Sequence, residues 1–449
     1  MATIDPALAE WALEQARVRG ASAAEVLFAS AESLSAGVRL GEIEKLKSAR
    51  ERRLGLRVFV GQSSATASTA ELERGALREF IGHTVGLARL TAPDPFSGLP
   101  DPGLHPRQLT ELELDDMAHG VIDAGTALAT ARKAERAALD ADERLRNSEG
   151  AEFDSGRYQV LFANSQGFSG QYSGTSYSLG VAPIAESDGS MQQGYWHSAN
   201  RHYEKLDDAE SVGVTAAKRA LRRLGARKVK TTRAPVIFEA EVAAGLIRSL
   251  AGAASGPSLY KGASFLIDRL GAQIAAPQVT IFDDGTMLGG IGSKPFDGEG
   301  LLTTRKAVIQ AGVLKTYLLD CYSARKLKLQ PTGNAARSAG EPPTVASTNL
   351  YLEPGPYSPE EIIRSVKEGL LVTELIGFGV NAVTGDYSRG ASGMWIENGE
   401  IAFPVQEITI AGNLKEMFMA IDMIGDDLRW RSSTVAPTIK ISEMMIAGT

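Results

Sequence analysis

Residues 234–256, APVIFEAEVAAGLIRSLAGAASG, run from an apolar strand straight into an alanine-rich helix. Pro235 to Phe238 is β-branched and apolar, which predicts a short strand. The run from Ala240 to Ala254 predicts a helix whose apolar side carries Leu246, Ile247, Leu250 and Ala254. Enzymes often place catalytic groups where a strand meets a helix. Residues 246–256 nevertheless contain no histidine, no cysteine and no paired carboxylates.

Length and composition place broad limits on the protein. A chain of 449 residues is long enough for two or three domains, and 43% hydrophobic residues suffice for packed cores. The net charge of −7 gives no reason to expect nucleic acid as a partner. The single cysteine, Cys321, excludes a disulfide within the chain and fits a reducing cytosol.

The sequence shows no targeting or membrane segment. Its first residues, MATIDPALAEWALEQ, are acidic and amphipathic, whereas a signal peptide is basic and then continuously apolar. No apolar run approaches the roughly 18 residues of a transmembrane helix. We therefore expect a cytoplasmic protein without membrane contact.

Residues 1–92 predict a small α+β domain. Asp5 caps a first helix that ends at Gly20, and Ser68 with Glu71 forms a capping box for a second helix ending near Leu90. Between them lie strand-like segments at 25–30, 34–40, 42–48 and 54–60. The prolines that follow predict a linker over residues 93–107: Pro93, Pro95, Pro100, Pro102 and Pro106.

Residues 108–227 repeat this plan of helix, meander and helix, which predicts a central α+β domain. A long helix is expected at 112–141, strands at 157–164, 169–173, 176–184 and 191–195, and a helix at 207–224 opened by Asp207 and Glu210. The helix leads into a basic run, residues 218–233. A phosphate-binding patch is one interpretation. A solvated helix end followed by a basic linker is favoured, because no aromatic residue interrupts the run.

Residues 228–449 predict a larger, mainly antiparallel β-rich domain with a few helices, so the fold class is α+β. Asn398 and Gly399 predict a tight hairpin between strands at 393–396 and 400–403. Ser358 starts a helix that reaches Gly369. Further strands are expected at 279–282, 308–309, 313–318 and 438–446, a turn at 283–285 and a last helix at 414–424.

Local motifs for chemistry are few. Only two histidines, His197 and His202, are near one another, and they lack a third metal ligand nearby. The sequence has no HExxH, CxxC or GxSxG motif, and residues 289–300 lack the spacing of a phosphate-binding loop. Cys321 lies in an apolar run and is interpreted as a buried structural residue.

One polar stretch remains, between Gly385 and Gly390. Asp386, Tyr387, Ser388 and Arg389 are expected on an exposed loop or edge strand. Such a surface suits binding, but an ordinary polar turn would have the same composition.

Several segments of the sequence resemble those of a known family. The chain resembles the TldD/PmbA family, specifically its PmbA or TldE branch, over nearly its whole length and most closely in the last third. The resemblance is carried by residues 234–256 and by the segments YKGASFLIDRLGAQIA, TIFDDGT, PFDGEGLLTTRKAVIQAGVLKTYLLDCYSARKL, PTGNAARS, GVNAVTGDYSRGASGMWIENGEIAFPVQEITIAGNLKEMF and IDMIGDDLRW.

The resemblance implies that this chain has lost a metal site. The TldD branch is a zinc metallopeptidase with HExxxH on the helix after the strand equivalent to residues 235–238, and with a cysteine ligand near its C-terminus. Arg248 and Ser249 stand where the first His and the Glu would be, and Ala253 where the second His would be. Residues 424–449 contain no cysteine. The resemblance thus implies no metal and no catalytic residue in this chain.

The implied function is that of a non-catalytic subunit. Such a chain pairs with a TldD-type zinc peptidase in a heterodimeric cytoplasmic metalloprotease that processes or degrades unfolded proteins and peptides, and residues Asp386 to Gly390 would face partner or substrate. A homodimer in isolation is compatible with this. Two alternatives stay open: a stand-alone, metal-independent hydrolase using His197 and His202, and a regulatory protein that modulates DNA gyrase.

Overall fold

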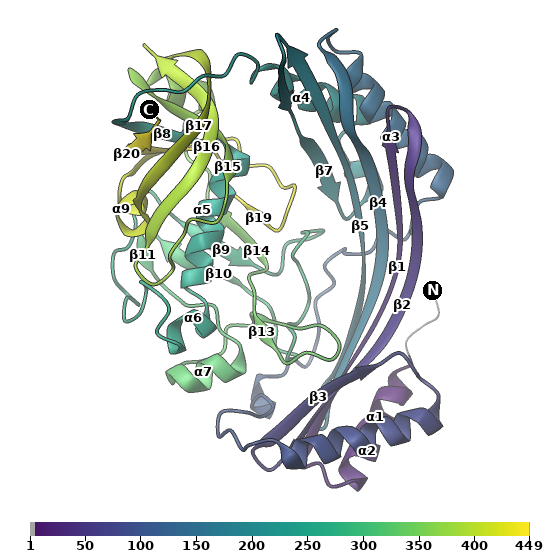
Figure 1. Ribbon diagram of the computed structural model, residues 1–449. Coiled ribbons are helices and arrows are strands. Elements are labelled where there is room, and N and C mark those ends of the chain that lie inside the picture. Colours follow the sequence, from purple (N-terminus) through teal and green to yellow (C-terminus); the bar gives the residue numbers. More distant parts are fainter. Residues whose placement is uncertain (1–4, 449) are drawn as a thin grey trace.

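The computed structural model describes residues 5–448 and has two parts (Figure 1). A long, curved antiparallel sheet with helices at both ends is built from the first half of the chain, and a β-rich body is built from the second half. The α+β class is confirmed. Within the described residues, no helix combines the length and the apolarity needed to cross a membrane.

Four long strands form the curved sheet: β1 (Ala23–Arg39), β2 (Glu42–Val60), β4 (Leu145–Asn164) and β5 (Ser169–Ser187). With β3 (Ser63–Thr69) and β6 (Ser190–Gln193) they take the order β3-β2-β1-β4-β5-β6, and β7 (Trp196–Asn200) also pairs with β5. The segments predicted separately at 25–30 and 34–40 are one strand, as are those at 42–48 and 54–60. Moreover, β1 pairs with β4 from Glu25 to Val38, so the two predicted meanders form a single sheet.

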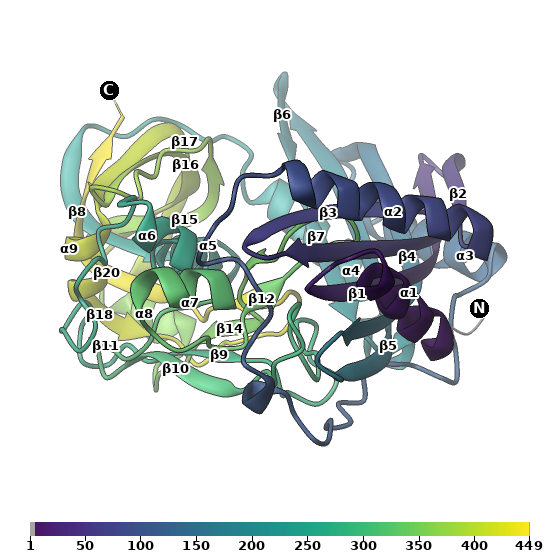
Figure 2. The same cartoon turned by 90° about the horizontal axis from the view of Figure 1, so that it is seen from below.

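Two helix pairs cover the same outer face of this sheet at its opposite ends (Figures 1 and 2). At the lower end of Figure 1, α1 (Pro6–Val18) and α2 (Arg74–Leu90) pack on a core that includes Val26, Phe28 and Leu161. At the upper end, α3 (Ala124–Leu139) and α4 (Ala209–Leu221) pack on Leu34, Val38 and Phe153. Even-numbered residues of β1 therefore face the helices, and odd-numbered ones face inward.

Three predicted helix starts were wrong, with the smallest difference at α4, whose N-cap is Asp208 and not Asp207. The N-cap of α2 is Glu73, whose carboxylate accepts hydrogen bonds from the N–H groups of Gly75 and Ala76, so Ser68 and Glu71 form no capping box there. The helix expected from residue 112 begins only after Asp123, which caps α3. Gly120 has a φ of 60°, which is outside the range of a right-handed helix, so a helix from residue 112 cannot continue through it. Single 3-10 turns lie at η1 (Pro102–Leu104) and η2 (Tyr203–Lys205).

The second part is organised around the predicted strand and helix, β8 (Thr232–Phe238) and α5 (Ala240–Ala253). One sheet has the order β17-β16-β15-β8-β20-β18, and an additional pairing of β17 with β20 closes all of these strands except β18 into a ring. Its other strands are β15 (Glu368–Ile376), β16 (Asp386–Glu397), β17 (Glu400–Asn413), β18 (Ile421–Ile424) and β20 (Ile439–Ala447).

A second sheet packs on the other side of α5, which contacts both β14 and β15. Its strands are β11 (Val313–Leu314), β10 (Arg305–Gln310), β9 (Ile281–Asp284), β14 (Asn349–Leu352) and β19 (Thr434–Val435), in that order. The remaining elements are the strand pair β12 (Ala335–Ala336) and β13 (Thr344–Val345) and the short helices α6 (Gly256–Tyr260), α7 (Cys321–Leu327), α8 (Pro359–Arg364) and α9 (Leu414–Met419).

The hairpin at Asn398 and Gly399 is confirmed, because both residues have positive φ and join β16 to β17. Three other predictions were wrong. Asp283, expected in a turn, is a fully buried residue of β9 that pairs with Lys306. The last predicted helix ends at Met419 and is followed by β18, and the helix after Ser358 ends at Arg364 because residues 368–376 pair as β15.

Candidate functional site

A continuous groove follows the inner face of the curved sheet, where it faces the β-rich body. Four cavities of about 620, 360, 350 and 370 Å³ lie along it. Neighbouring cavities share lining residues: Tyr158 links the first two, Asp154 and Ser178 link the next two, and Tyr195 and His197 link the last two. We call this feature the inner groove.

Small side chains keep the floor of the inner groove low. The register of the sheet places Gly156 of β4 beside Ser176 of β5, and the pairs on either side bring Gly174 and Ser178 to the same face. A side chain at Gly174 would meet the Tyr158 hydroxyl at 2.6 Å. The glycine residues in SGQYSGTSYSLG thus leave room for larger neighbouring side chains, such as Tyr158, on the side of β5 that lacks helices.

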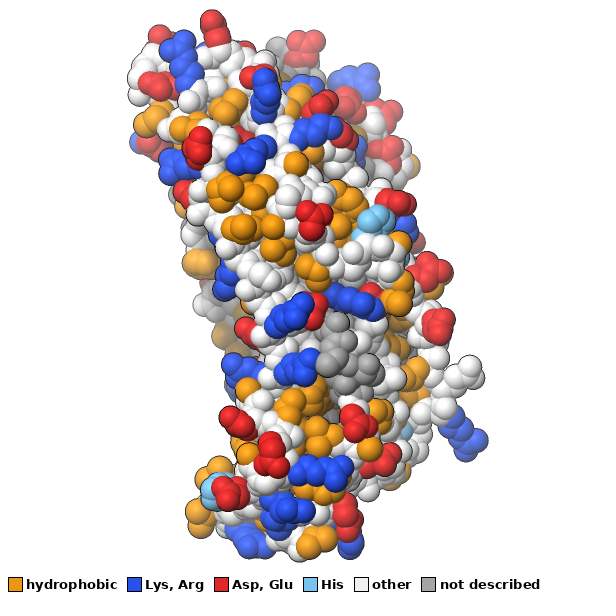
Figure 3. Space-filling model, turned by 90° about the vertical axis from the view of Figure 1, so that its right-hand side faces the viewer, with side chains coloured by type: hydrophobic (Ala, Val, Ile, Leu, Met, Phe, Trp, Pro, Cys, Tyr) orange, Lys and Arg blue, Asp and Glu red, His pale blue; other side chains and the backbone are white. Residues whose placement is uncertain are grey.

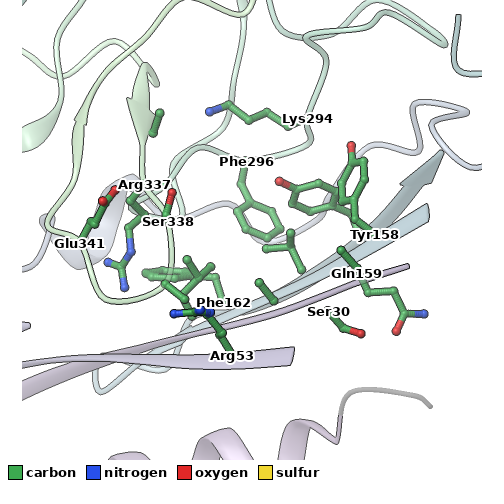
Figure 4. A pocket seen from close by; sticks show the side chains of 18 of the residues that line it. Ser30, Arg53, Tyr158, Gln159, Phe162, Lys294, Phe296, Arg337, Ser338 and Glu341 are labelled. Carbon is green, nitrogen blue, oxygen red and sulfur yellow. The ribbon is translucent and has the colours of Figure 1, made fainter. Parts of the chain in front are cut away.

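The largest cavity, at the lower end of the groove, has an apolar interior (Figure 4). Val160, Phe162 and Tyr172 contribute from the sheet, and Phe296 enters from the β-rich body. The Phe296 ring lies edge-on to Tyr172, with their centroids 5.2 Å apart. Charged side chains of Glu51, Arg53, Lys294, Arg337 and Glu341 line the rest of the cavity.

Buried charges anchor the wall that carries Phe296. Lys294 Nζ donates to the Ala335 carbonyl oxygen at 2.9 Å, and burial lowers the Lys294 pKa. Asp297 accepts hydrogen bonds from the N–H groups of Glu299, Leu301 and Ala335 at 2.9 to 3.0 Å, and burial raises its pKa. Because these bonds fix the backbone on both sides, Phe296 is held in place.

Glu299 is the most strongly perturbed carboxyl of this wall. It accepts a hydrogen bond from the Cys321 N–H at 2.8 Å. Burial, with the nearby charges of Asp297 and Asp320, raises the Glu299 pKa to about 8. The Cys321 thiol is buried as predicted, and desolvation together with Glu299 raises its pKa, so it is not set up as a nucleophile.

Ion pairs tie the two parts of the molecule together below the largest cavity. Glu25 of β1 interacts with Arg57 of β2 and with Arg337 of the β-rich body, and all three side chains are buried. Arg325 donates to the carbonyl oxygens of Phe96, Gly98 and Leu99 in the proline-rich segment. The lower end of the groove is therefore a fixed junction.

The upper end is held by a second cluster. The guanidinium groups of Arg219 and Arg431 lie 4.9 and 4.0 Å from the ring centroid of Trp196. Glu239, just before α5, pairs with Arg219 at 2.7 Å and with Arg222 at 2.9 Å. Burial opposes ionisation of Glu239, but the hydrogen bond and charge of Arg222 outweigh it and lower the Glu239 pKa.

Three arginines of the basic run at 218–233 are part of the junction. Besides the pairs of Arg219 and Arg222 with Glu239, Arg223 pairs with Glu374 at 2.7 Å. The favoured interpretation, a solvated helix end and linker, was wrong for these three arginines. Arg227 lies 3.6 Å from the Phe403 ring centroid but is exposed, as are Lys218, Lys228 and Lys230. The outer face of the molecule carries interspersed acidic and basic side chains (Figure 3).

The three positions that the resemblance aligns with the zinc motif carry side chains of different kinds. Arg248 is exposed, Ser249 Oγ donates to the Gly245 carbonyl oxygen at 2.9 Å, and Ala253 is fully buried. Position 248 is exposed and position 253 is buried in the core, so the two positions have different surroundings. A cation, an already bonded hydroxyl and a methyl group do not fit zinc. Across residues 5–448, no cluster of three or more His, Cys, Asp or Glu side chains is arranged to hold a metal ion.

Residues Asp386 to Gly390 open strand β16 and line none of the four cavities. Asp386 is exposed and accepts hydrogen bonds from Thr384 Oγ1 and Asn413 Nδ2 at 2.6 and 3.0 Å. Tyr387 belongs to the core, and burial raises its pKa to about 12. Ser388 is exposed, whereas Arg389 and Gly390 are half-buried.

The two neighbouring histidines have separate surroundings. His197 stacks on Tyr195 at the upper end of the inner groove, and burial lowers its pKa. His202 lies with Nε2 3.0 Å from the Glu113 carbonyl oxygen. Sequence reasoning missed the groove itself, for which the one available signal was the row of glycine and serine residues along β5.

Comparison with known proteins identifies the family to which the chain belongs. Residues 24–88, 120–224 and 231–448 match the models of domain 1, the central domain and the C-terminal domain of the PmbA/TldA metallopeptidases. The chain is 40% identical to metalloprotease PmbA of Escherichia coli O157:H7, covering 95% of this chain and 92% of that one. It is 39% identical to a PmbA homologue of Haemophilus influenzae, covering 98% and 95%.

Solved structures share the fold. A candidate modulator of DNA gyrase from Bacteroides thetaiotaomicron superposes with a TM-score of 0.91 at 29% identity, covering 99% of this chain and 98% of that one. TldE from Thermococcus kodakarensis superposes with a TM-score of 0.88 at 22% identity, covering 98% and 100%. With the sequence identities to the PmbA proteins, these matches establish that the chain belongs to the PmbA/TldD metallopeptidase family.

Proposed function

We propose that this chain is the non-catalytic PmbA/TldE-type subunit of a two-chain metalloprotease that acts on unfolded proteins and peptides. The zinc ion and the general base would belong to a TldD-type partner, and the complex would work in the cytoplasm. The observation that carries the proposal is the environment of α5: Arg248, Ser249 and Ala253 offer zinc no set of ligands.

The inner groove supports a role in holding substrate. It runs along strands of 17 to 20 residues, which suits an extended chain better than a compact ligand. In addition, β2 pairs with β3 only from Leu54 to Val60, so within the described sheet residues 42–53 pair with β1 alone. An extended peptide can bind such an edge through backbone hydrogen bonds, which tolerate almost any sequence.

Co-expression with a TldD-type protein of the same genome tests the proposal. We expect the two chains to elute as one complex and to cleave an unfolded substrate such as β-casein only when both are present. Each chain purified alone serves as the control. Failure of the two chains to associate, or casein cleavage by this chain alone, would reject the proposal.

Measuring zinc content shows which of the two subunits binds the metal. After dialysis against EDTA and then zinc, we expect about one zinc per heterodimer and none bound tightly by this chain alone. A Glu-to-Gln change in the partner's HExxxH motif should abolish cleavage while leaving the complex intact. Stoichiometric zinc in this chain would contradict the proposed division of labour.

A further inference from the structure

We propose that the 620 Å³ cavity accepts a large apolar side chain, such as Phe or Leu, of a peptide that lies along the inner groove. The peptide as occupant rests on the proposed function. The preference for an apolar side chain rests on the rings that line the cavity, and its volume, which lies within the roughly 300–1,000 Å³ of pockets for whole small ligands, has room for such a side chain and the backbone next to it.

The rings of the pocket are packed against one another before anything binds. Phe296 lies 5.2 Å from Tyr172, 5.5 Å from Phe168 and 6.5 Å from Phe162, measured between ring centroids. The backbone around Phe296 is fixed by the buried hydrogen bonds of Lys294 and Asp297. A pocket that is already formed loses little conformational entropy when it binds an apolar group.

The charges in the pocket favour an apolar occupant over an ionic one. Arg337 is paired with Glu25, and Lys294 already donates to the Ala335 carbonyl oxygen. Arg53 and Glu51 carry opposite charges on the same strand, and Asp297 and Glu341 complete a lining with three acidic and three basic side chains. An added carboxylate or ammonium group would therefore enter a nearly neutral, partly desolvated site, at a cost in hydration.

The neighbouring strand edge favours a peptide over a free hydrocarbon. Glu51 and Arg53 belong to the part of β2 that pairs only with β1, so the pocket opens beside a strand edge that can bind a backbone. A peptide can pair with that edge through its N–H and C=O groups, and a hydrocarbon cannot.

Peptides that differ at one position test the pocket. The probes are N-acetylated Ser-Gly-Ser-X-Ser-Gly-Ser with the same C-terminal spacer and fluorescein, where X is Ala, Leu, Phe or Glu. Binding to the full chain is measured by fluorescence anisotropy. We expect the Phe and Leu peptides to bind at least about tenfold more tightly than the Ala and Glu peptides, since burying a large apolar side chain is worth that much or more.

Two matched variants locate the preference. Ala29 lines the pocket from β1, and Ala29→Leu should narrow it and reduce the preference for the Phe peptide over the Ala peptide. Ala49 of β2 lies on the same face of the sheet but lines none of the four cavities, so Ala49→Leu should keep the preference. Circular dichroism checks that both variants fold.

The pocket proposal would be overturned if all four peptides bound equally or if none of them bound. It would also be overturned if Ala29→Leu kept the preference for the Phe and Leu peptides, or if Ala49→Leu lost it as well. Co-elution with the TldD-type chain is measured separately. A complex that forms normally without any side-chain preference would leave the subunit proposal standing and remove the pocket alone.

Discussion

At the scale of single residues, Glu299 is a buried acid whose environment favours its protonated form. Its pKa is raised to about 8, above the ordinary value near 4.5. Between these two values the folded state keeps a proton that the unfolded state has lost. The contribution of Glu299 to stability is therefore complete below about pH 4.5 and is lost as the pH rises toward 8.

We predict that Glu299→Gln reduces the pH dependence of the free energy of unfolding between about pH 4.5 and pH 8. The Gln side chain has no charge to bury, and its carbonyl oxygen can still accept the Cys321 N–H. The variant should gain stability relative to the native chain with rising pH, by up to about 1.4 kcal/mol per pH unit. Urea unfolding at pH 5, 6, 7 and 8 measures this difference, and a difference independent of pH would contradict the prediction.

A second prediction concerns the positions aligned with the zinc motif. The variant Arg248→His, Ser249→Glu, Ala253→His should still bind no stoichiometric zinc after dialysis against EDTA and then zinc. Position 253 is fully buried among core side chains, so a histidine there has no room to reach a metal, and residues 424–449 lack a cysteine. Tightly bound zinc, measured with a colorimetric chelator, would refute this.

The single variant Ala253→His is the control for packing. A side chain larger by a whole ring overfills the site, which costs about 1–3 kcal/mol or more. If Ala253→His alone lowers the unfolding midpoint and Arg248→His does not, the burial of position 253 accounts for the destabilisation.

At the scale of elements, backbone chemistry explains which predictions held. The hairpin at Asn398 and Gly399 was predictable because few residues accept positive φ at two successive positions. The strand and helix at 235–254 were predictable because the strand is continuously apolar and the helix has apolar residues at helical spacing along one side. The ends of α8 and α9 were not, because Glu368 to Ile376 and Ile421 to Ile424 continue as strands whose partners lie far away in the sequence.

We predict opposite effects for two Gly-to-Ala changes. Gly399 has φ of 81°, and an added Cβ would lie 2.9 Å from the Arg364 carbonyl oxygen, so Gly399→Ala should cost about 1–2 kcal/mol. Gly245 lies inside α5 with nothing within 4 Å of an added Cβ, so Gly245→Ala should gain about 0.5–1 kcal/mol. Thermal unfolding of both variants tests this, and equal shifts would contradict it.

At the scale of the whole molecule, the inner groove joins segments that no local pattern connects. Ala29 in β1, Val160 in β4 and Phe296 in the β-rich body line the same cavity. Local sequence patterns also failed to show the full length of β1 and β2, because the middle of each strand lacks a buried apolar face. There, β1 carries Ala31 to Ser33 and β2 carries the charged run 50–53. Sequence reasoning therefore gave two meanders where pairing between distant strands makes one sheet.

This shared sheet predicts that the first 107 residues do not fold alone. Without β4, the edge of β1 from Glu25 to Val38 loses its hydrogen-bond partners, and the lower core loses Leu161 and Ala163. An unpaired edge of that length also invites aggregation. A fragment of residues 1–107 should therefore lack cooperative thermal unfolding by circular dichroism and should self-associate. A fragment of residues 1–227, which restores β4 and β5, should unfold cooperatively at the same concentration. A monomeric 1–107 fragment with a sharp unfolding transition would show instead that the N-terminal unit is independent and that its pairing with β4 adds little to its stability.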